Sequence, residues 1–279
     1  MQNPTITVLI PGAARPIGRA IARRFAAAGA NLILPYYDWP EDVAAMEDEF
    51  WRQDVPFLAM ACDLRQAEEV AQLIAAAQQR FAGLDILVNN IERGGMPIVH
   101  GSYDLPANAD QWQLELTTTL TAKWLLYHHA LPLLRRAERA AVVNISSIAG
   151  CAGRSGPVAN LFNDAYSAAN RAVSSFTETW AREGAPSLRV NELMLGLIES
   201  RHGEQTRGWQ ILSTEERQAL SNHTLLHRRG LPDEVARAVY FLAVEATYMT
   251  GSVVRMDGGY LLGGDRVPAM PPGIIAKPE

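Results

Sequence analysis

The sequence has few of the residues that build disulfide frameworks, metal centres and basic surfaces. Only Cys62 and Cys151 are cysteines among 279 residues, too few for a disulfide framework or a cysteine metal site. The net charge of −5 gives no basic footprint for nucleic acid. No apolar run is long enough to cross a bilayer, and the first residues lack the pattern of a signal peptide. We therefore expect a cytoplasmic protein that holds no metal and binds neither nucleic acid nor membrane.

Short apolar, β-rich segments alternate with segments whose apolar residues recur at helical spacing. The predicted strands are 5–10, 31–34, 57–61, 84–88, 141–145, 188–195 and 252–256, and the predicted helices are 17–28, 43–50, 70–81, 112–134, one that begins at 166, and 232–243. Such alternation is typical of βαβ units with right-handed crossovers. We predict one α/β domain over residues 1–262, a Rossmann-like, doubly wound parallel sheet of about seven strands with helices on both faces.

Three segments lie outside this alternation. Residues 94–110 are rich in Gly and Pro and predict a long surface loop. Residues 201–229 are polar and predict a substrate lid with one or two helices. Residues 263–279 contain four prolines and no periodic pattern, so we predict a C-terminal tail that is either flexible or packed on a neighbouring subunit.

Two glycines between the first strand and the first helix indicate a phosphate-binding turn. Gly12 and Gly18 bracket this turn, where backbone N–H groups and the positive end of the helix can face a pyrophosphate. Pro16 interrupts the pattern because it has no N–H and adds a ring. Two interpretations stay open: Pro16 starts the helix, which it does well at a first turn, or it weakens dinucleotide binding.

A second group of polar residues follows the strand at 141–145. Ser146 and Ser147 end that strand, and Tyr166 opens the next helix. Ligands of open α/β sheets bind outside the carboxyl ends of the strands. We therefore expect a hydroxyl and the phenol to converge there on a small-molecule substrate.

Together these motifs resemble the short-chain dehydrogenase/reductase family over residues 5–263. The resemblance implies that Ser147, rather than Ser146, polarises the substrate oxygen and that Tyr166 is the general acid/base. Where the family has a lysine four residues after the tyrosine, this chain has Asn170, so YxxxN replaces YxxxK. The relay asparagine of the family falls on Thr119. A free phenol has a pKa of about 10, which a nearby ammonium lowers, so the exchange at Asn170 matters for proton transfer.

The resemblance also implies a binding site for NAD(P). Its expected contacts are Gly12, Arg15, Ile17, Gly18, Tyr36, Asp63, Leu64, Asn89, Asn90, Ile198 and Ser200. Tyr36 stands where an acid would select NAD, and Arg15 could meet the 2′-phosphate of NADP, which is slightly favoured; a solvated role for Arg15 stays open. Ile91 and Glu92 are bulkier than the residues of the family, so the cofactor could also bind weakly or not at all.

Two further residues bear on the chemistry. Lys123 and Lys277 are the only lysines, and Lys123 lies one turn beyond Thr119, where its ammonium could compensate for Asn170. We nevertheless favour a partly solvated or interface position for Lys123. Cys151 lies in a lengthened segment, 151–164, that is expected to shape the substrate mouth, and we predict that its thiol is buried and inert.

Three functions are compatible with these residues. The first is an NAD(P)-dependent oxidoreductase that acts on a small alcohol or carbonyl with an atypical Thr-Ser-Tyr-Asn site. The second is a catalytically silent subunit that forms a hetero-oligomer with an active relative. The third, ranked last, is non-redox chemistry like that of halohydrin dehalogenases. The resemblance also implies a homodimer or homotetramer formed through the helices at 112–134 and after 166.

Overall fold

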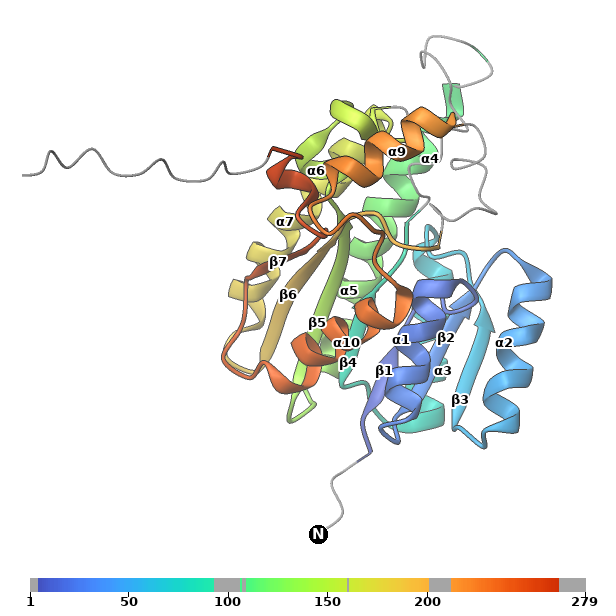
Figure 1. Cartoon of the computed structure of the whole chain (residues 1–279). Coiled ribbons are helices and arrows are strands. Elements are labelled where there is room, and N and C mark those ends of the chain that lie inside the picture. The colour runs from blue at the N-terminus through green and yellow to red at the C-terminus, as the bar shows by residue number, and fades with distance from the viewer. Residues whose placement is uncertain (1–4, 93–105, 107–108, 160, 201–211, 266–279) are drawn as a thin grey trace, which may run out of the picture.

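The computed structural model of the chain describes residues 5–92, 106, 109–159, 161–200 and 212–265. Seven parallel strands form one sheet in the order β3-β2-β1-β4-β5-β6-β7 (Figure 1). Their bounds are β1 Thr7–Leu9, β2 Asn31–Tyr36, β3 Phe57–Ala61, β4 Ile86–Asn89, β5 Ala140–Ser147, β6 Leu188–Leu195 and β7 Val253–Met256. The chain winds outward from β1 to one edge and then from β4 to the other, which confirms the predicted doubly wound fold.

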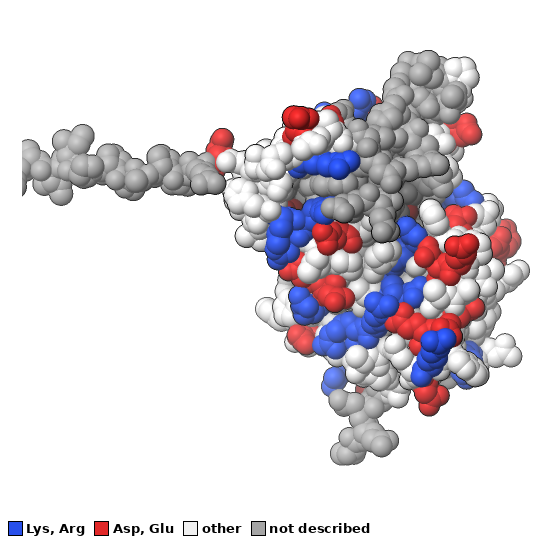
Figure 2. Space-filling model, turned by 45° about the vertical axis from the view of Figure 1, so that its right-hand side comes forward, with Lys and Arg blue, Asp and Glu red and all other residues white. Residues whose placement is uncertain are grey.

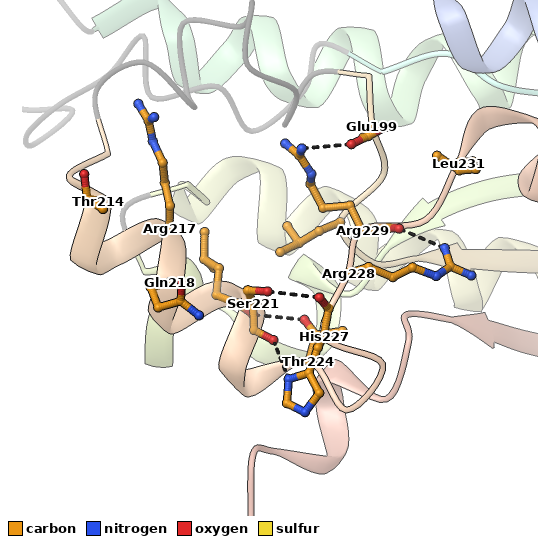
Figure 3. Close-up of a pocket in the computed structure, with 12 residues that line it drawn as sticks. Glu199, Thr214, Arg217, Gln218, Ser221, Thr224, His227, Arg228, Arg229 and Leu231 are labelled. Carbon is orange, nitrogen blue, oxygen red and sulfur yellow. Dashed lines mark hydrogen bonds and ion pairs between the residues drawn. The ribbon is translucent and has the colours of Figure 1, made fainter.

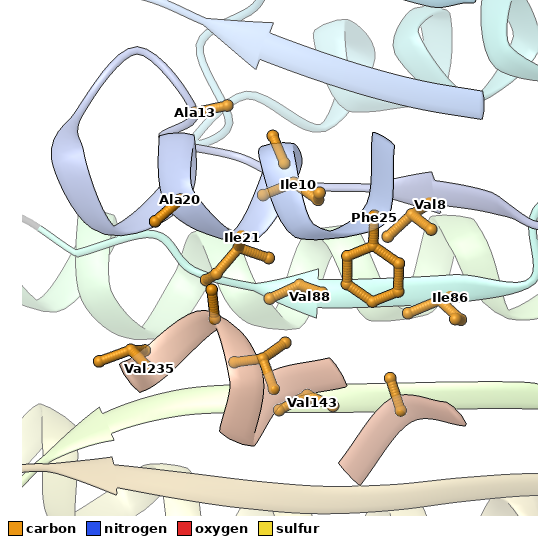
Figure 4. Close-up of a cluster of buried hydrophobic side chains, with 14 of the residues drawn as sticks. Val8, Ile10, Ala13, Ala20, Ile21, Phe25, Ile86, Val88, Val143 and Val235 are labelled. Atoms are coloured by element: carbon orange, nitrogen blue, oxygen red, sulfur yellow. The ribbon is translucent and has the colours of Figure 1, made fainter. Parts of the chain in front are cut away.

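Helices cover both faces of the sheet. One face carries α1 Pro16–Ala26, α2 Pro40–Arg52 and α10 Pro232–Tyr240, and the other carries α3 Ala67–Phe81, α5 Ala122–Leu134 and α7 Asp164–Gly184. Figure 4 shows Phe25 and Ile21 of α1 packed against Val88 of the sheet and Val235 of α10. Smaller elements are α4 Ala109–Leu116, η2 Thr117–Thr121, α6 Ala149–Ala152, η3 Gly156–Val158, α9 Thr214–His223, η4 Phe241–Glu245 and η5 Tyr260–Leu262.

The predicted continuous helix at 112–134 is interrupted by a widened turn. Between α4 and α5 the five residues of η2 form a π-helical turn, in which the Ala122 N–H donates to the Thr117 carbonyl oxygen. Single π-turns inside helices are frequent at functional sites. Pro132 does not end α5, which continues to Leu134.

Several predicted segments lie wholly or partly outside the described residues. Most of the loop at 94–110, the first half of the lid at 201–229 and nearly all of the tail at 263–279 belong to this group. The described part of the lid contains α9. Among the described residues, no helix has the length and apolar character that a membrane span requires.

Acidic and basic side chains alternate on the face drawn in Figure 2. Ion pairs among the described residues include Arg19–Glu49 at 3.0 Å and Arg52–Asp48 at 3.0 Å.

Candidate active site

A cavity of about 820 Å³ lies at the carboxyl edge of the sheet. Its size is that of a small-molecule or cofactor site. The predicted site residues that line it are Gly12, Arg15, Ile17, Gly18, Tyr36, Asp63, Leu64, Asn90, Ser147, Tyr166, Ile198 and Ser200. Asn89, Thr119 and Asn170 do not line it, and each is fully buried. The fold thus joins the two motifs, the glycine turn and the Ser-Tyr pair, in one space.

The glycine turn has the geometry of an anion-binding helix start. Gly12 has a φ of +71°, and the N–H of Arg15 donates to its carbonyl oxygen at 3.0 Å. A Cβ on Gly18 would lie 2.3 Å from that same oxygen, so only glycine lets the helix approach so closely. Pro16 is at the first turn of α1, which confirms that it starts the helix. The N–H groups of Ile17 and Gly18 have no acceptor within the helix, so these residues fit a pyrophosphate.

Two arginines flank the end of the cavity beyond β2 and β3. Arg15 forms an ion pair with Asp42 and lies 4.3 Å above the Trp39 ring. Arg65 pairs with Asp63 at 2.7 Å, and this hydrogen bond lowers the pKa of the Asp63 carboxyl. The predicted cation at Arg15 is therefore present in the cavity, already paired with a carboxylate.

The other end of the cavity holds the hydroxyl and the phenol. Ser147 ends β5, and its Oγ accepts a hydrogen bond from the Ala149 N–H at 3.1 Å. Tyr166 lies in the first turn of α7, where its N–H donates to the Asn163 side chain at 2.7 Å. The phenol donates to Oε2 of Glu92 at 3.1 Å. Glu92 follows β4 and also lines the cavity.

Asn170 is turned into its own helix. Its Nδ2 donates to the Tyr166 carbonyl oxygen at 3.0 Å, and its Oδ1 has no hydrogen-bond partner among the described residues. Thr119 lies in the π-turn and is likewise fully buried. Of the predicted Thr-Ser-Tyr-Asn set, only Ser147 and Tyr166 therefore face the cavity.

Lys123 is buried, whereas we predicted a partly solvated or interface position for it. It is 1 % exposed, and its Nζ donates to the carbonyl oxygen of Ile91. The prediction was wrong because most of α5 is buried. The residues of this helix on either side of Lys123 in sequence, including Ala122, Leu125 and Leu126, are buried and apolar. Asn89 holds the backbone of this helix, since its Nδ2 donates to the Lys123 carbonyl oxygen at 3.3 Å. Asn89 therefore ties β4 to α5 beneath the cavity.

A buried carboxylate that the sequence reading missed lies behind the cavity. Glu192 of β6 is fully buried and accepts hydrogen bonds from Ser146 at 2.5 Å, Ser174 at 3.2 Å and Thr177 at 3.3 Å. Burial raises the pKa of Glu192, whereas these hydrogen bonds and the charge of Lys123 act in the opposite direction. A single acid between apolar strand neighbours was the signal in the sequence that could have identified it.

The two cysteines differ in exposure: Cys151 is exposed and Cys62 is buried. Cys151 is exposed, which contradicts the prediction of a buried thiol. It lies in α6, a short helix whose Cys151 position faces outward, with its sulfur 3.8 Å from that of Met194. Cys62 is buried beside the cavity, and desolvation together with the charges of Glu69 and Asp63 raises its pKa to about 12.

A second cavity, of about 500 Å³, lies between α9 and the segment after it (Figure 3). Arg229 pairs there with Glu199 at 2.8 Å, and Ser221 donates to the His227 carbonyl oxygen at 3.1 Å. Ser147 and Tyr166 do not line this cavity. Within the described ranges there is no group of three or more His, Cys, Asp or Glu side chains that could hold a metal ion.

Comparisons with known proteins agree with this architecture. A family model described as Enoyl-(Acyl carrier protein) reductase matches residues 12–261. The chain is 32 % identical to D-beta-hydroxybutyrate dehydrogenase of Rhizobium meliloti (strain 1021), covering 92 % of this chain and 98 % of the relative. It is 31 % identical to a 3-oxoacyl-[acyl-carrier-protein] reductase of Synechocystis sp., covering 91 % and 96 %.

A solved structure of the same kind superimposes on the fold. It is the short-chain dehydrogenase/reductase SDR:Glucose/ribitol dehydrogenase of Brucella melitensis, with a TM-score of 0.76 and 28 % sequence identity. The alignment covers 91 % of this chain and 96 % of that one. With the family model and the relatives, this likeness establishes that the chain belongs to the short-chain dehydrogenase/reductase family.

Proposed function

We propose that this protein is an oxidoreductase that transfers a hydride between NAD(P)(H) and a small alcohol or carbonyl compound. The observation that carries the proposal is the shared cavity, in which Ser147 and Tyr166 lie together with the glycine turn at residues 12–18. The names of two relatives, a hydroxybutyrate dehydrogenase and a 3-oxoacyl reductase, favour a substrate whose oxygen is on the third carbon of an acyl chain.

The chain's own residues divide the work between binding and proton transfer. Bound NAD(P) would supply the hydride donor or acceptor, with its pyrophosphate at the turn that ends in Ile17 and Gly18. Ser147 accepts a backbone hydrogen bond, so its own hydroxyl proton remains available to the substrate oxygen. Tyr166 would exchange a proton with that oxygen as general acid or base.

We infer a slight preference for NADP from two arginines in the cavity. Arg15 and Arg65 both line the cavity close to Tyr36 at the end of β2. Planar guanidinium groups bind phosphate through two parallel hydrogen bonds. A 2′-phosphate would have to compete with Asp42 and Asp63 for these groups, so we propose a preference rather than an exclusion of NAD.

The test is a turnover assay with defined probes. Purified protein is given NADPH or NADH with acetoacetate or an acetoacetyl thioester, and the oxidised cofactors with 3-hydroxybutyrate in the reverse direction. We expect turnover that Tyr166→Phe abolishes and that Ser147→Ala lowers by two orders of magnitude or more, on the order of a lost general acid or oxyanion donor. Failure to bind either cofactor would overturn the proposal.

The silent-subunit function is the second candidate. It is favoured by Asn170, which is bonded to its own helix and brings no charge to Tyr166. Direct titration of the protein with NADH and NADPH, followed by fluorescence, separates the two candidates. An oxidoreductase must bind one of these cofactors, so tight binding counts against the silent subunit. Analytical ultracentrifugation tests the accompanying proposal of a homodimer or homotetramer, which the exposed Trp112 and Trp124 on α4 and α5 support.

A further inference from the structure

The phenol of Tyr166 and the carboxylate of Glu92 form a direct pair inside the larger cavity. The hydroxyl donates to Oε2 over 3.1 Å, and the two residues come from segments 74 positions apart in the chain. Tyr166 is only 4 % exposed, whereas Glu92 is half-buried. Glu92 is therefore the more exposed residue of the pair.

We propose that Glu92 is the proton acceptor of Tyr166, so that protons pass between the substrate and water through a phenol–carboxylate pair. The inference rests on the proposed oxidoreductase function and names the relay that would serve it. Glu92 acts through Tyr166 and does not contact the substrate.

The proposed transfer balances in the direction of alcohol oxidation. As the alcohol gives up its hydride to NAD(P)⁺, its O–H bond breaks and that proton binds to the Tyr166 oxygen. The phenolic O–H bond breaks in the same step, and its proton binds to Oε2 of Glu92. Tyr166 remains a neutral phenol, the substrate becomes a carbonyl compound, and the carboxylic acid returns its proton to water. Reduction runs through the same positions in reverse.

Transfer through the pair does not require a free Tyr166 phenolate, which the neighbouring Glu92 carboxylate would disfavour. A carboxylate near a phenol opposes ionisation of the phenol, because two negative charges would then lie side by side. Among the described residues, ionisable groups around this end of α7 include Asp164 of its first turn, which pairs with Arg154 at 3.5 Å, Glu115 of α4 and Lys123 of α5, and Glu192 of β6 lies further along the helix at Ser174. The Lys123 ammonium is bonded to the carbonyl oxygen of Ile91, the residue before Glu92, so it offsets part of this negative charge.

The first test needs no cofactor. The ultraviolet absorbance of tyrosinate is measured as a function of pH in the wild type and in Glu92→Gln. From each curve, the curve of the same protein carrying Tyr166→Phe is subtracted, and the difference is the ionisation step of Tyr166. We expect Tyr166 to ionise at lower pH in Glu92→Gln, because the amide carries no charge. Glu138→Gln, which changes an exposed carboxylate outside the cavity, is the matched control and should leave the step unchanged. An unmoved step in Glu92→Gln would overturn the pairing.

The second test measures turnover of 3-hydroxybutyrate with NADP⁺. We expect Glu92→Gln to lower kcat about a hundredfold, the lower end of what a positioned proton acceptor contributes, with little change in KM. Glu92→Asp should retain part of the activity and show a larger solvent isotope effect. If the wild type turns over and Glu92→Gln keeps its kcat, the relay is refuted. If the wild type does not turn over, the proposed function fails for this probe, while the tyrosinate titration still decides the pairing.

Discussion

The ammonium of Lys123 donates a hydrogen bond to the carbonyl oxygen of Ile91, a residue that lines the same cavity as Tyr166. The same ammonium acts electrostatically on the fully buried carboxylate of Glu192. Opposite charges in the interior offset each other's cost of desolvation, and removal of one leaves the other uncompensated. Lys123 therefore holds, through Ile91, the segment that carries Glu92, and its charge eases the burial of the Glu192 carboxylate.

Lys123→Met should destabilise the protein at neutral pH by about 2 kcal/mol, within the range of a lost hydrogen bond to a charged group, because the Ile91 carbonyl oxygen loses its donor and Glu192 loses a nearby positive charge. Burial raises the pKa of Glu192, so its ionised form opposes folding, and loss of the lysine charge removes one influence that lowers this pKa. The stability of the variant should therefore be highest below the ordinary pKa of a carboxyl, near 4.5, and fall as the pH rises through the raised value. Urea unfolding across this pH range measures the effect.

The control for this prediction is a double-mutant cycle. Glu192→Gln removes the charge that Lys123 compensates, so Lys123→Met should cost less in that background than in the wild type. Equal costs in the two backgrounds would show that the two groups are not coupled.

Gly18→Ala should prevent cofactor binding and reduce stability. The added Cβ would lie 2.3 Å from the carbonyl oxygen of Gly12 and 2.8 Å from the N–H nitrogen of Ala13, and both are backbone atoms that cannot move aside cheaply. Gly83→Ala is the matched control, because a Cβ at that position meets no atom within 4 Å and the residue does not have a positive φ. Thermal unfolding and NADPH titration of both variants check the prediction, and unchanged binding in Gly18→Ala would contradict it.

Much of the fold could be predicted because the pattern of each element is local. The predicted strand at 188–195 matches β6, and that at 57–61 matches β3. The end of β2 could not be predicted in this way. We predicted that the strand ends at Leu34, but pairing of Tyr36 with Ala61 extends it. Ends of elements are set by such partners, which periodicity does not reveal.

The site residues also fall into those that could be predicted from local sequence and those that could not. Residues next to strand ends, such as Gly12 and Ser147, could be assigned because the topology brings strand ends together. The contact of Tyr166 with Glu92 and the burial of Lys123 depend on side chains from several elements that meet only in the folded chain. Charge at Lys123 suggested solvent, but its ammonium is bonded to the carbonyl oxygen of Ile91 and also acts on the buried carboxylate of Glu192.

The two thiols should differ sharply in reactivity. Cys151 is exposed, whereas burial raises the pKa of Cys62 to about 12, so almost none of the Cys62 thiolate exists at neutral pH. Because the thiolate is the reactive form, iodoacetamide should modify Cys151 and spare Cys62 in the folded protein. Peptide mass spectrometry measures this, with Cys151→Ser as the variant that should remain unlabelled until it is unfolded. Equal labelling of both cysteines would contradict the burial of Cys62.

Arg15→Ala should weaken the binding of NADPH more than that of NADH. The Arg15 guanidinium lines the cavity above Trp39, and a 2′-phosphate can bind it only by replacing Asp42. Since charge-assisted hydrogen bonds contribute about 1.5–3 kcal/mol each, the loss should be roughly tenfold or more for NADPH and small for NADH. Arg52→Ala removes an exposed guanidinium that is paired with Asp48 and does not line the cavity, so it should affect neither cofactor. Calorimetric titration with both cofactors decides the matter, because an equal loss for NADH and NADPH would assign Arg15 to the structure of the turn instead of the phosphate.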